Sequence, residues 1–200
     1  MPHRKWFAAA VMLALILPAA AQDDKPLYPL KVGTKWSYKV KDQEEKFVVT
    51  ATKEEMVGDQ NCVKLEARLK DQIVASEHVA ILKDGIYRFK FDDKAIEPPV
   101  CFCKLPATKG QKWEVKFKVA GKDGVAKFES GEEEISVPAG KFQTVVIKGE
   151  VVEDSVPIKM TLWFAPGSGI VRQVIDGGGQ QPIVLELESI ERPGEKKDQK

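Results

Sequence analysis

The sequence predicts an all-β fold: an antiparallel sheet or barrel built from two similar halves, with little helix. Apolar and polar residues alternate in segments along the whole chain, as in strands that bury one face. Gly, Pro and Asp recur every 8–15 residues between these segments, at the spacing of turns in an antiparallel sheet. Three short patterns also occur twice in the same order, which indicates an internal repeat.

The first 21 residues have the three parts of a secretory signal peptide. Arg4 and Lys5 form its basic start, residues 6–17 are apolar, and small residues follow Pro18 up to Ala21. The apolar part is shorter than the roughly 20 residues that a membrane-spanning helix needs. No cysteine follows it to carry a lipid anchor. We therefore predict cleavage after Ala21 and a secreted or periplasmic protein without an integral membrane span.

Cleavage also changes the charge and the histidine count. The formal net charge of the whole chain is +1, and loss of the leader leaves 29 basic and 30 acidic residues. This near balance argues against a nucleic-acid partner. His3 leaves with the leader, so His78 is then the one histidine.

The strand signal runs through the rest of the chain. Its clearest segments are 36–40, 63–69, 113–119, 158–162 and 184–188. Residues 22–28 are predicted to be a flexible lead-in. Residues 191–200 are charged and lack apolar anchors, so we predict a disordered tail there. The span 22–190 is predicted to be a single β domain.

The repeated patterns divide this domain into two halves, about 29–103 and 104–176. Because a sheet of about 75 residues buries its face poorly on its own, we expect the halves to share one sheet or barrel. The two tryptophans at matched positions are expected to anchor the core. The matches are Pro29-x3-Gly33-x2-Trp36 with Pro106-x3-Gly110-x2-Trp113, Gly58-x3-Cys62-Val63 with Gly140-x3-Thr144-Val145, and Gly85-Ile86-x-Arg88 with Gly169-Ile170-x-Arg172.

The sequence shows no arrangement typical of an enzyme. His78 lies in a predicted strand, and no Gly-x-Ser-x-Gly motif accompanies it. Cys101-Phe102-Cys103 offers two metal ligands without a histidine nearby, which makes a weak site. Gly177-Gly178-Gly179 is not followed by the Lys-Ser/Thr of a phosphate-binding loop. We predict a protein that is not an enzyme and has no cofactor or metal.

The three cysteines would face an oxidising compartment after export. Cys101 and Cys103 point to the same side of an extended segment and are badly placed to bond each other. Cys62 is therefore the predicted partner of Cys101. A bond to Cys103 instead, or three buried free thiols, are the alternatives.

Two stretches read as turns and carry a family resemblance. Val137-Pro138-Ala139-Gly140-Lys141-Phe142 reads as a strand end followed by a turn, with Pro138 outside the ladder. Residues 158–164 and 170–175 read as a hairpin around Pro166, Gly167 and Gly169. With Pro29-Leu30-x2-Gly33-x2-Trp36-x-Tyr38, these stretches resemble a TapB-like family of exported bacterial β-proteins. The resemblance implies a curved antiparallel sheet similar to the half-barrels of lipoprotein carriers, and it transfers no catalytic residue.

The sequence thus predicts an exported, non-enzymatic envelope or secreted β-protein of unknown specific role. A concave sheet face is expected to bind an apolar small molecule or a protein segment. The alternative is a scaffold protein that pairs with a partner through an exposed sheet edge.

Overall fold

The computed structural model describes residues 25–153, 156–179 and 181–194, and these form twelve strands and no helix. The all-β prediction is confirmed. The signal-peptide prediction, with its cleavage site, lies outside the described residues. The strands are β1 (Lys35–Val40), β2 (Lys46–Val57), β3 (Gln60–Leu69), β4 (Gln72–Leu82), β5 (Gly85–Phe91), β6 (Lys94–Lys104), β7 (Lys112–Val119), β8 (Lys122–Val137), β9 (Gly140–Glu153), β10 (Val156–Ala165), β11 (Gly169–Asp176) and β12 (Ile183–Glu191).

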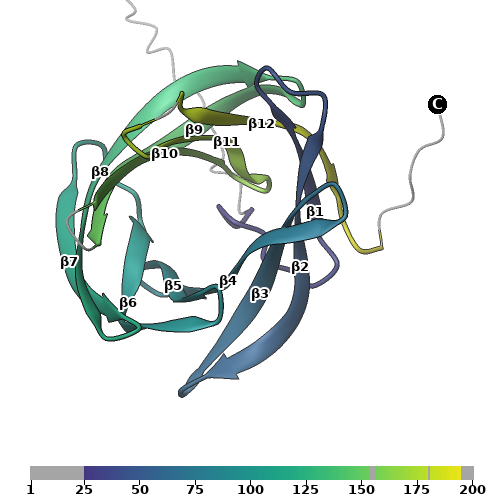
Figure 1. Ribbon diagram of the computed structural model, residues 1–200. Helices are drawn as coiled ribbons and strands as arrows, with labels where there is room; N and C mark the ends of the chain where they lie inside the picture. Colours follow the sequence, from purple (N-terminus) through teal and green to yellow (C-terminus); the bar gives the residue numbers. More distant parts are fainter. Residues whose placement is uncertain (1–24, 154–155, 180, 195–200) are drawn as a thin grey trace, which may run out of the picture.

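The strands form a closed barrel in which each pairs with its neighbours in the sequence (Figure 1). All pairs are antiparallel, and β1 closes the ring against β12, with Lys35 opposite Glu191 and Val40 opposite Leu185. The predicted sheet or barrel is therefore a closed barrel rather than a half-barrel. Successive strands run in opposite directions. The turns that lead from an even-numbered strand to the next odd-numbered strand, such as the β10–β11 turn, therefore all lie at one end of the barrel. The odd-to-even connections, such as β5–β6, lie at the opposite end, which we call the mouth.

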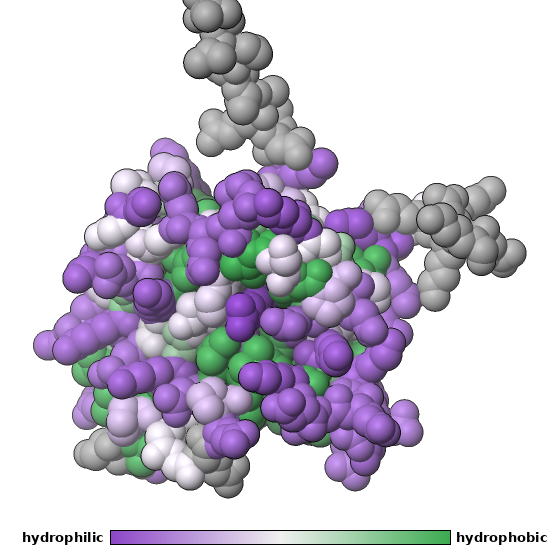
Figure 2. Space-filling model, turned by 90° about the horizontal axis from the view of Figure 1, so that it is seen from above, coloured by the Kyte–Doolittle hydropathy of each residue, from purple (hydrophilic) through white to green (hydrophobic). Residues whose placement is uncertain are grey.

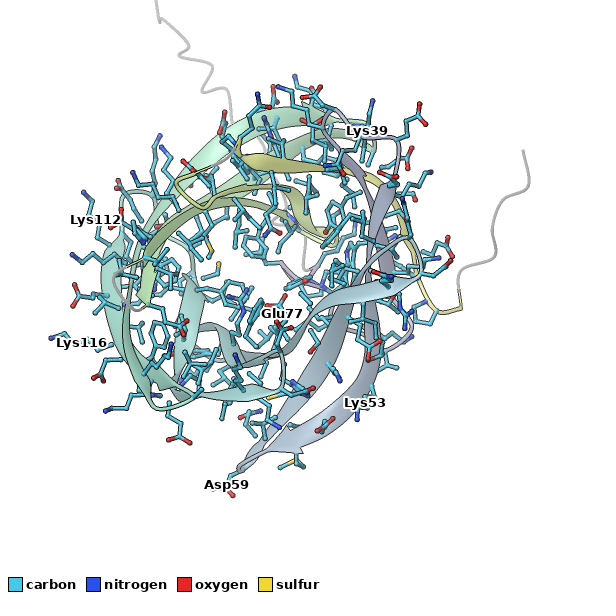
Figure 3. The ribbon with its side chains drawn as sticks, in the orientation of Figure 1. Lys39, Lys53, Asp59, Glu77, Lys112 and Lys116 are labelled. Carbon is cyan, nitrogen blue, oxygen red and sulfur yellow. The ribbon has the colours of Figure 1, made fainter. Side chains whose placement is uncertain are left out.

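Alternation sets which side chains face inward. In β7, Trp113, Val115, Phe117 and Val119 are half-buried or buried, whereas the intervening residues are exposed. Lys112 and Lys116 point away from the barrel, and Glu77 points into it (Figure 3). The wall seen in Figure 2 is mainly hydrophilic, with smaller hydrophobic areas between the polar side chains. Burial of the inward face supplies most of the driving force for folding.

Between β6 and β7 the ladder is short. Only Ile96–Val119 and Glu97–Lys118 are paired. Pro98 and Pro99 follow in β6 and have no backbone N–H to donate. The Trp113 indole Nε1 donates instead to the Cys101 carbonyl at 2.8 Å, so a side chain joins the strands where the backbone does not.

The segment before β1 seals the end of the barrel opposite the mouth, which we call the sealed end. Gly167 N donates to the Pro26 carbonyl at 2.8 Å, and Tyr28 is only 3% exposed. The Tyr28 ring meets Trp36 and Phe164 edge-on, with ring centroids 5.5 and 5.8 Å away. Leu27 and Tyr28 are therefore packed on the barrel and the Pro26 carbonyl is hydrogen-bonded to it, so this part of the chain is not the flexible lead-in that the sequence predicts. Residues 22–24 lie outside the described ranges.

The chain's other end also packs on the barrel. Glu191 is the last residue of β12, and the Arg192 Nη2 donates to the Gly167 carbonyl at 2.8 Å. A Cβ added to Gly33 would lie 3.3 Å from Pro193 Cβ, so this proline covers the turn before β1. The sequence placed all of these C-terminal residues in a disordered tail. The rest of that tail, 195–200, lies outside the described residues.

The repeated patterns fall at matching places in the strand order. Gly33 precedes β1 and Gly110 precedes β7, and each glycine N–H donates to a carbonyl on the next strand, of Ala51 and Ser130 respectively. Ala51 N and Ser130 N donate back to Thr34 O and Gln111 O. Trp36 is fully buried, whereas Trp113 is half-buried and stacks on Phe128. The duplication of the halves 29–103 and 104–176 remains a prediction, which this hydrogen-bond pattern favours.

Candidate functional site

The barrel interior contains two adjoining hollows, which together we call the lumen. The first has a volume of about 390 Å³ and the second about 300 Å³, and both are lined by Glu77, Arg88, Phe91, Gln173 and Ile175. Ligand pockets of roughly 300–1,000 Å³ with apolar walls and a few polar groups are typical of small-molecule sites. The other lining residues of the first are Val40, Gln43, Phe47, Val49, Leu65, Ala67, Leu69, Val74, Ala75, Ser76, Ile183 and Leu185. Those of the second are Ile96, Val100, Phe102, Phe117, Val119, Ala126, Phe128, Val151, Glu153, Ile158, Met160, Leu162 and Ile170.

An ion pair lies where the two hollows meet. Arg88 Nε donates to Glu77 Oε2 at 2.5 Å, and the side chains are 22% and 23% exposed. Strand β4 supplies Glu77 and β5 supplies Arg88, with Val79 opposite Arg88 in the ladder. A charged pair in a lumen with mostly apolar walls is costly to desolvate, so its presence there requires a structural or functional reason.

Two aromatic rings hold the Arg88 guanidinium in place. Its Cζ lies 5.2 Å from the Phe102 ring centroid and 5.7 Å from that of Phe91. Such cation–π contacts stabilise a cation that is partly removed from water. Arg88 is thus fixed by one carboxylate and two rings, and the direction of its side chain is set before any ligand arrives.

Two buried tyrosines near the sealed end, Tyr28 and Tyr38, stay protonated. Burial raises the pKa of Tyr28 and of Tyr38, and the negative charge of Glu77 raises both further. The Tyr38 hydroxyl donates to the Ile170 carbonyl at 2.8 Å. The Trp36 indole Nε1 donates to the Ser168 carbonyl at 2.8 Å. These bonds satisfy the side-chain donors of Trp36 and Tyr38, so these two polar groups are buried at the sealed end with hydrogen-bond partners.

The mouth of the lumen is rimmed by exposed apolar side chains. They lie within the first three residues of β4, β10 and β12 and at the last residue of β5, all at the same end of the barrel. Four of them also line the lumen, so the hollows open there. The rim residues are Ile73, Val74, Phe91, Val156, Ile158 and Ile183, with exposed fractions between 40% and 56%.

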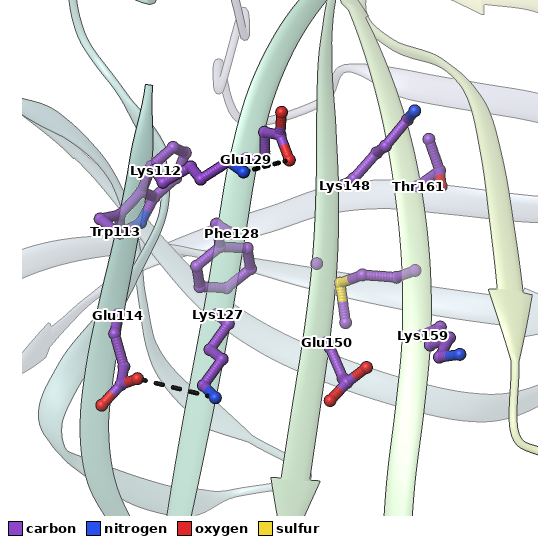
Figure 4. A pocket seen from close by; sticks show the side chains of 12 residues that line it. Lys112, Trp113, Glu114, Lys127, Phe128, Glu129, Lys148, Glu150, Lys159 and Thr161 are labelled. Atoms are coloured by element: carbon purple, nitrogen blue, oxygen red, sulfur yellow. Dashed lines mark ion pairs between the residues drawn. The ribbon is translucent and has the colours of Figure 1, made fainter. Parts of the chain in front are cut away.

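A shallow depression of about 660 Å³ lies on the outer wall over β7–β10 (Figure 4). Its charged side chains alternate across the strands: Lys112 lies 3.5 Å from Glu129, and Lys127 lies 3.9 Å from Glu114. Such exposed pairs are typical of a solvated sheet face and contribute little individually. The lumen, with its enclosed apolar walls, is the better candidate site.

The catalytic and metal-binding candidates are not brought together. His78 is 1% exposed, and its Nε2 lies 3.5 Å from Glu55 Oε2, too far for a good hydrogen bond. Neither ring nitrogen has a hydrogen-bond partner within the part of the chain that the structure describes. Ser76 uses its backbone N–H to bind Asp92 Oδ1 at 2.8 Å. No group of three potential metal ligands occurs among the described residues, and no helix among them is long and apolar enough to span a membrane.

All three cysteines are buried and free. Cys62 lies on β3 and Cys101 on β6, and β4 and β5 separate these strands in the ring. Strands lie about 4.8 Å apart, so three steps exceed the reach of a disulfide. The predicted Cys62–Cys101 bond is therefore not confirmed, and neither is the alternative with Cys103. Burial raises the pKa of each thiol, that of Cys103 to about 12.

The turn residues of the two motifs lie at the sealed end, away from the lumen. Pro138 is in the short β8–β9 connection, and Gly140 begins β9 with a φ of 136°. Pro166 and Gly167 lie in the β10–β11 turn. A Cβ on Gly169 would come within 2.6 Å of the Tyr28 ring, so the absence of a side chain at this position leaves room for that ring. The motif turns therefore belong to the sealed end and not to the lining of the lumen.

Sequence reasoning missed Glu77 and Arg88. Arg88 belongs to a repeated sequence pattern, but that pattern does not indicate where its side chain points. A signal was present: Glu77 lies two residues before the fully buried Val79, and Arg88 two residues after the fully buried Ile86. Both charges therefore fall on the inward parity of their strands.

No protein-family model matches the chain, and no curated protein matches its sequence. Two solved structures match it at low identity. One, a predicted exported protein with a YmcC-like fold from Bacteroides fragilis, is 13% identical over 82% of this chain and 98% of its own, with a TM-score of 0.45. The other, a predicted lipoprotein from Parabacteroides distasonis, is 14% identical over 85% of this chain and 100% of its own, with a TM-score of 0.49. The resemblance to a TapB-like family is not confirmed and stays a prediction.

Proposed function

We propose that the protein is an exported, non-enzymatic carrier that holds an elongated apolar small molecule in its lumen. The observation that carries the proposal is the interior of the barrel: two adjoining hollows with mostly apolar walls, buried aromatic side chains that close one end and an apolar rim at the other. An apolar ligand would gain about 25 cal/mol for each Å² that it removes from water. Export rests on the leader sequence in residues 1–21.

Ligand retention provides the first test. The protein is expressed with its leader in a bacterial host, purified from the extracytoplasmic fraction and examined by native mass spectrometry and organic extraction. The delipidated protein is then titrated with N-phenyl-1-naphthylamine, a neutral apolar probe whose fluorescence rises in apolar surroundings. We expect saturable binding of one probe per chain, and failure to bind it would refute the carrier function.

A matched pair of variants locates the bound probe. Ala75 lines the first hollow, whereas Lys116 points outward from β7 (Figure 3). Ala75→Trp fills part of the lumen and is expected to weaken probe binding at least tenfold. Lys116→Trp adds the same indole to the outer wall and should leave binding unchanged. Equal weakening by both variants, or by neither, would place the probe elsewhere.

The sheet-edge alternative has little room in this fold. Each strand of the described residues has a neighbour on both sides, so no edge strand is free. The β6–β7 ladder, which has two paired positions, is the shortest and offers the most backbone groups to an added strand. A stable protein partner recovered with the delipidated carrier, and lost when β6–β7 is cross-linked by engineered cysteines, would favour this alternative.

A further inference from the structure

We propose that the lumen recognises a neutral hydrogen-bond acceptor on its ligand, such as the carbonyl of an acyl ester or amide, through the free edge of Arg88. This inference rests on the proposed carrier function and names the ligand class for the same lumen. It makes the ligand an amphiphile with an uncharged polar group between two apolar parts.

Arg88 has hydrogen-bond donors that the described residues do not use. The guanidinium carries five N–H donors in a planar fork. Its Nε binds Glu77, and the two Nη nitrogens have no hydrogen-bond partner among the residues that the structure describes. Arg88 lines both hollows, so these donors face space that a ligand can fill. Gln173 lines the same junction and adds an amide with one donor group and one acceptor.

The positive charge of Arg88, where the two hollows meet, is already balanced by Glu77. Glu77 lies 2.5 Å from Arg88 and already compensates its charge. A ligand carboxylate at the Nη atoms would bring a second negative charge beside Glu77, and Glu153 lies in the wall of the second hollow. Burial of an uncompensated charge between apolar walls is strongly unfavourable. A neutral carbonyl receives hydrogen bonds from a charged donor without this cost.

Arg88 lies between two apolar spaces. Apolar hollows extend from Arg88 toward both β1–β3 and β6–β10. A ligand whose polar group contacts Arg88 therefore has apolar surroundings on both sides of that group. This arrangement fits an ester or amide within a chain better than a terminal head group that must reach water.

Three compounds that share a ten-carbon chain test the inference by displacement of N-phenyl-1-naphthylamine at pH 8: methyl decanoate, decanoate and decane. We expect methyl decanoate to bind about tenfold more tightly than decane, the size of effect that one charge-assisted hydrogen bond gives. We also expect it to bind more tightly than ionised decanoate. Equal binding of ester and hydrocarbon, or preference for the carboxylate, would overturn the inference while the carrier function stands. Absence of probe binding would refute both.

A single isosteric change provides the sharper test. Glu77→Gln removes the negative charge and leaves Arg88 uncompensated, so the preference should invert from methyl decanoate to decanoate. If Glu77 had a purely structural role, Glu77→Gln would weaken the binding of all three compounds alike and leave their order of affinity unchanged. That result would contradict the inference. Arg88→Lys retains the positive charge but loses the planar fork, so the advantage of the ester over decane should fall. Circular dichroism confirms that each variant is folded, and Arg88→Lys supplies the test if Glu77→Gln is not.

Discussion

The Phe128 ring lies against Gly149, its cross-strand neighbour on β9, and occupies the space where a side chain would be. A Cβ on Gly149 would lie 2.9 Å from two ring carbons of Phe128 and 3.1 Å from Met160 Cγ. Phe128 and Met160 both line the lumen, so this glycine lets large side chains shape its wall.

Gly149→Ala should therefore destabilise the protein by about 1–3 kcal/mol, because the wall is overpacked. The matched control is Gly131→Ala on β8, where the nearest atom to the added methyl is 3.9 Å away. That change should be neutral or stabilise by up to about 1 kcal/mol through the unfolded chain. Urea unfolding measures both free energies. The cost of Gly149→Ala should shrink in a Phe128→Leu background, and an unchanged cost would contradict the steric explanation.

Tyr28 packs the N-terminal segment against the sealed end of the barrel. Tyr28→Ala removes a ring that is 3% exposed and contacts both Trp36 and Phe164, so we expect a loss of about 3–5 kcal/mol. Val32→Ala in the same segment is the control, since Val32 is 37% exposed and should change stability by less than about 0.5 kcal/mol. Thermal and urea unfolding provide the values. Similar values for the two variants would show that the segment does not seal the barrel.

The three thiols should be unreactive while the protein is folded. The thiolate is the nucleophile, and burial raises the pKa of Cys62, Cys101 and Cys103. At pH 8 we expect slow alkylation of the native protein and three alkylated thiols per chain, without reductant, after denaturation in guanidinium. A Lys116→Cys variant places a thiol on the outer wall and should react rapidly. A single reactive thiol after unreduced denaturation would reveal a disulfide that the structure does not contain.

The strands were predictable because their signal is local. In β7 each inward apolar residue follows an outward charged or polar one, and an alternation of this kind identifies a half-buried strand without any knowledge of its neighbours. The β10–β11 hairpin was equally accessible, since Pro166 and Gly167 specify its turn. Closure of the barrel could not be predicted from such local patterns. It depends on β1 pairing with β12, and no residue near Lys35 indicates that Glu191 will lie opposite it.

The lumen was hidden for a different reason. Strict alternation from Ile86 would place Arg88 and Lys90 inside and Phe91 outside. The ladder instead shifts between Arg88 and Lys90, so that Lys90 lies opposite His78 while Phe91 joins Arg88 in the lumen wall. A β-bulge of this kind re-aims the side chains that follow it. Period-two reasoning finds the strand but misassigns the residue that stacks on the guanidinium.

Glu55, on the outer wall, should make the free energy of unfolding depend measurably on pH. The hydrogen bond from Lys53, at 2.7 Å, and then the contact with His78 lower the pKa of Glu55 from 4.5 to about 2. Since the folded-state pKa lies below the unfolded value, the ionised carboxylate stabilises the fold above about pH 4.5. This contribution is lost as the pH falls toward 2. NMR titration of the Glu55 side chain should show the low pKa, and Lys53→Met should raise it. By urea unfolding, Glu55→Gln should be less stable than wild type at pH 7 and equal to it near pH 2. A difference that is the same at both pH values would show that Glu55 acts through packing and not through its charge.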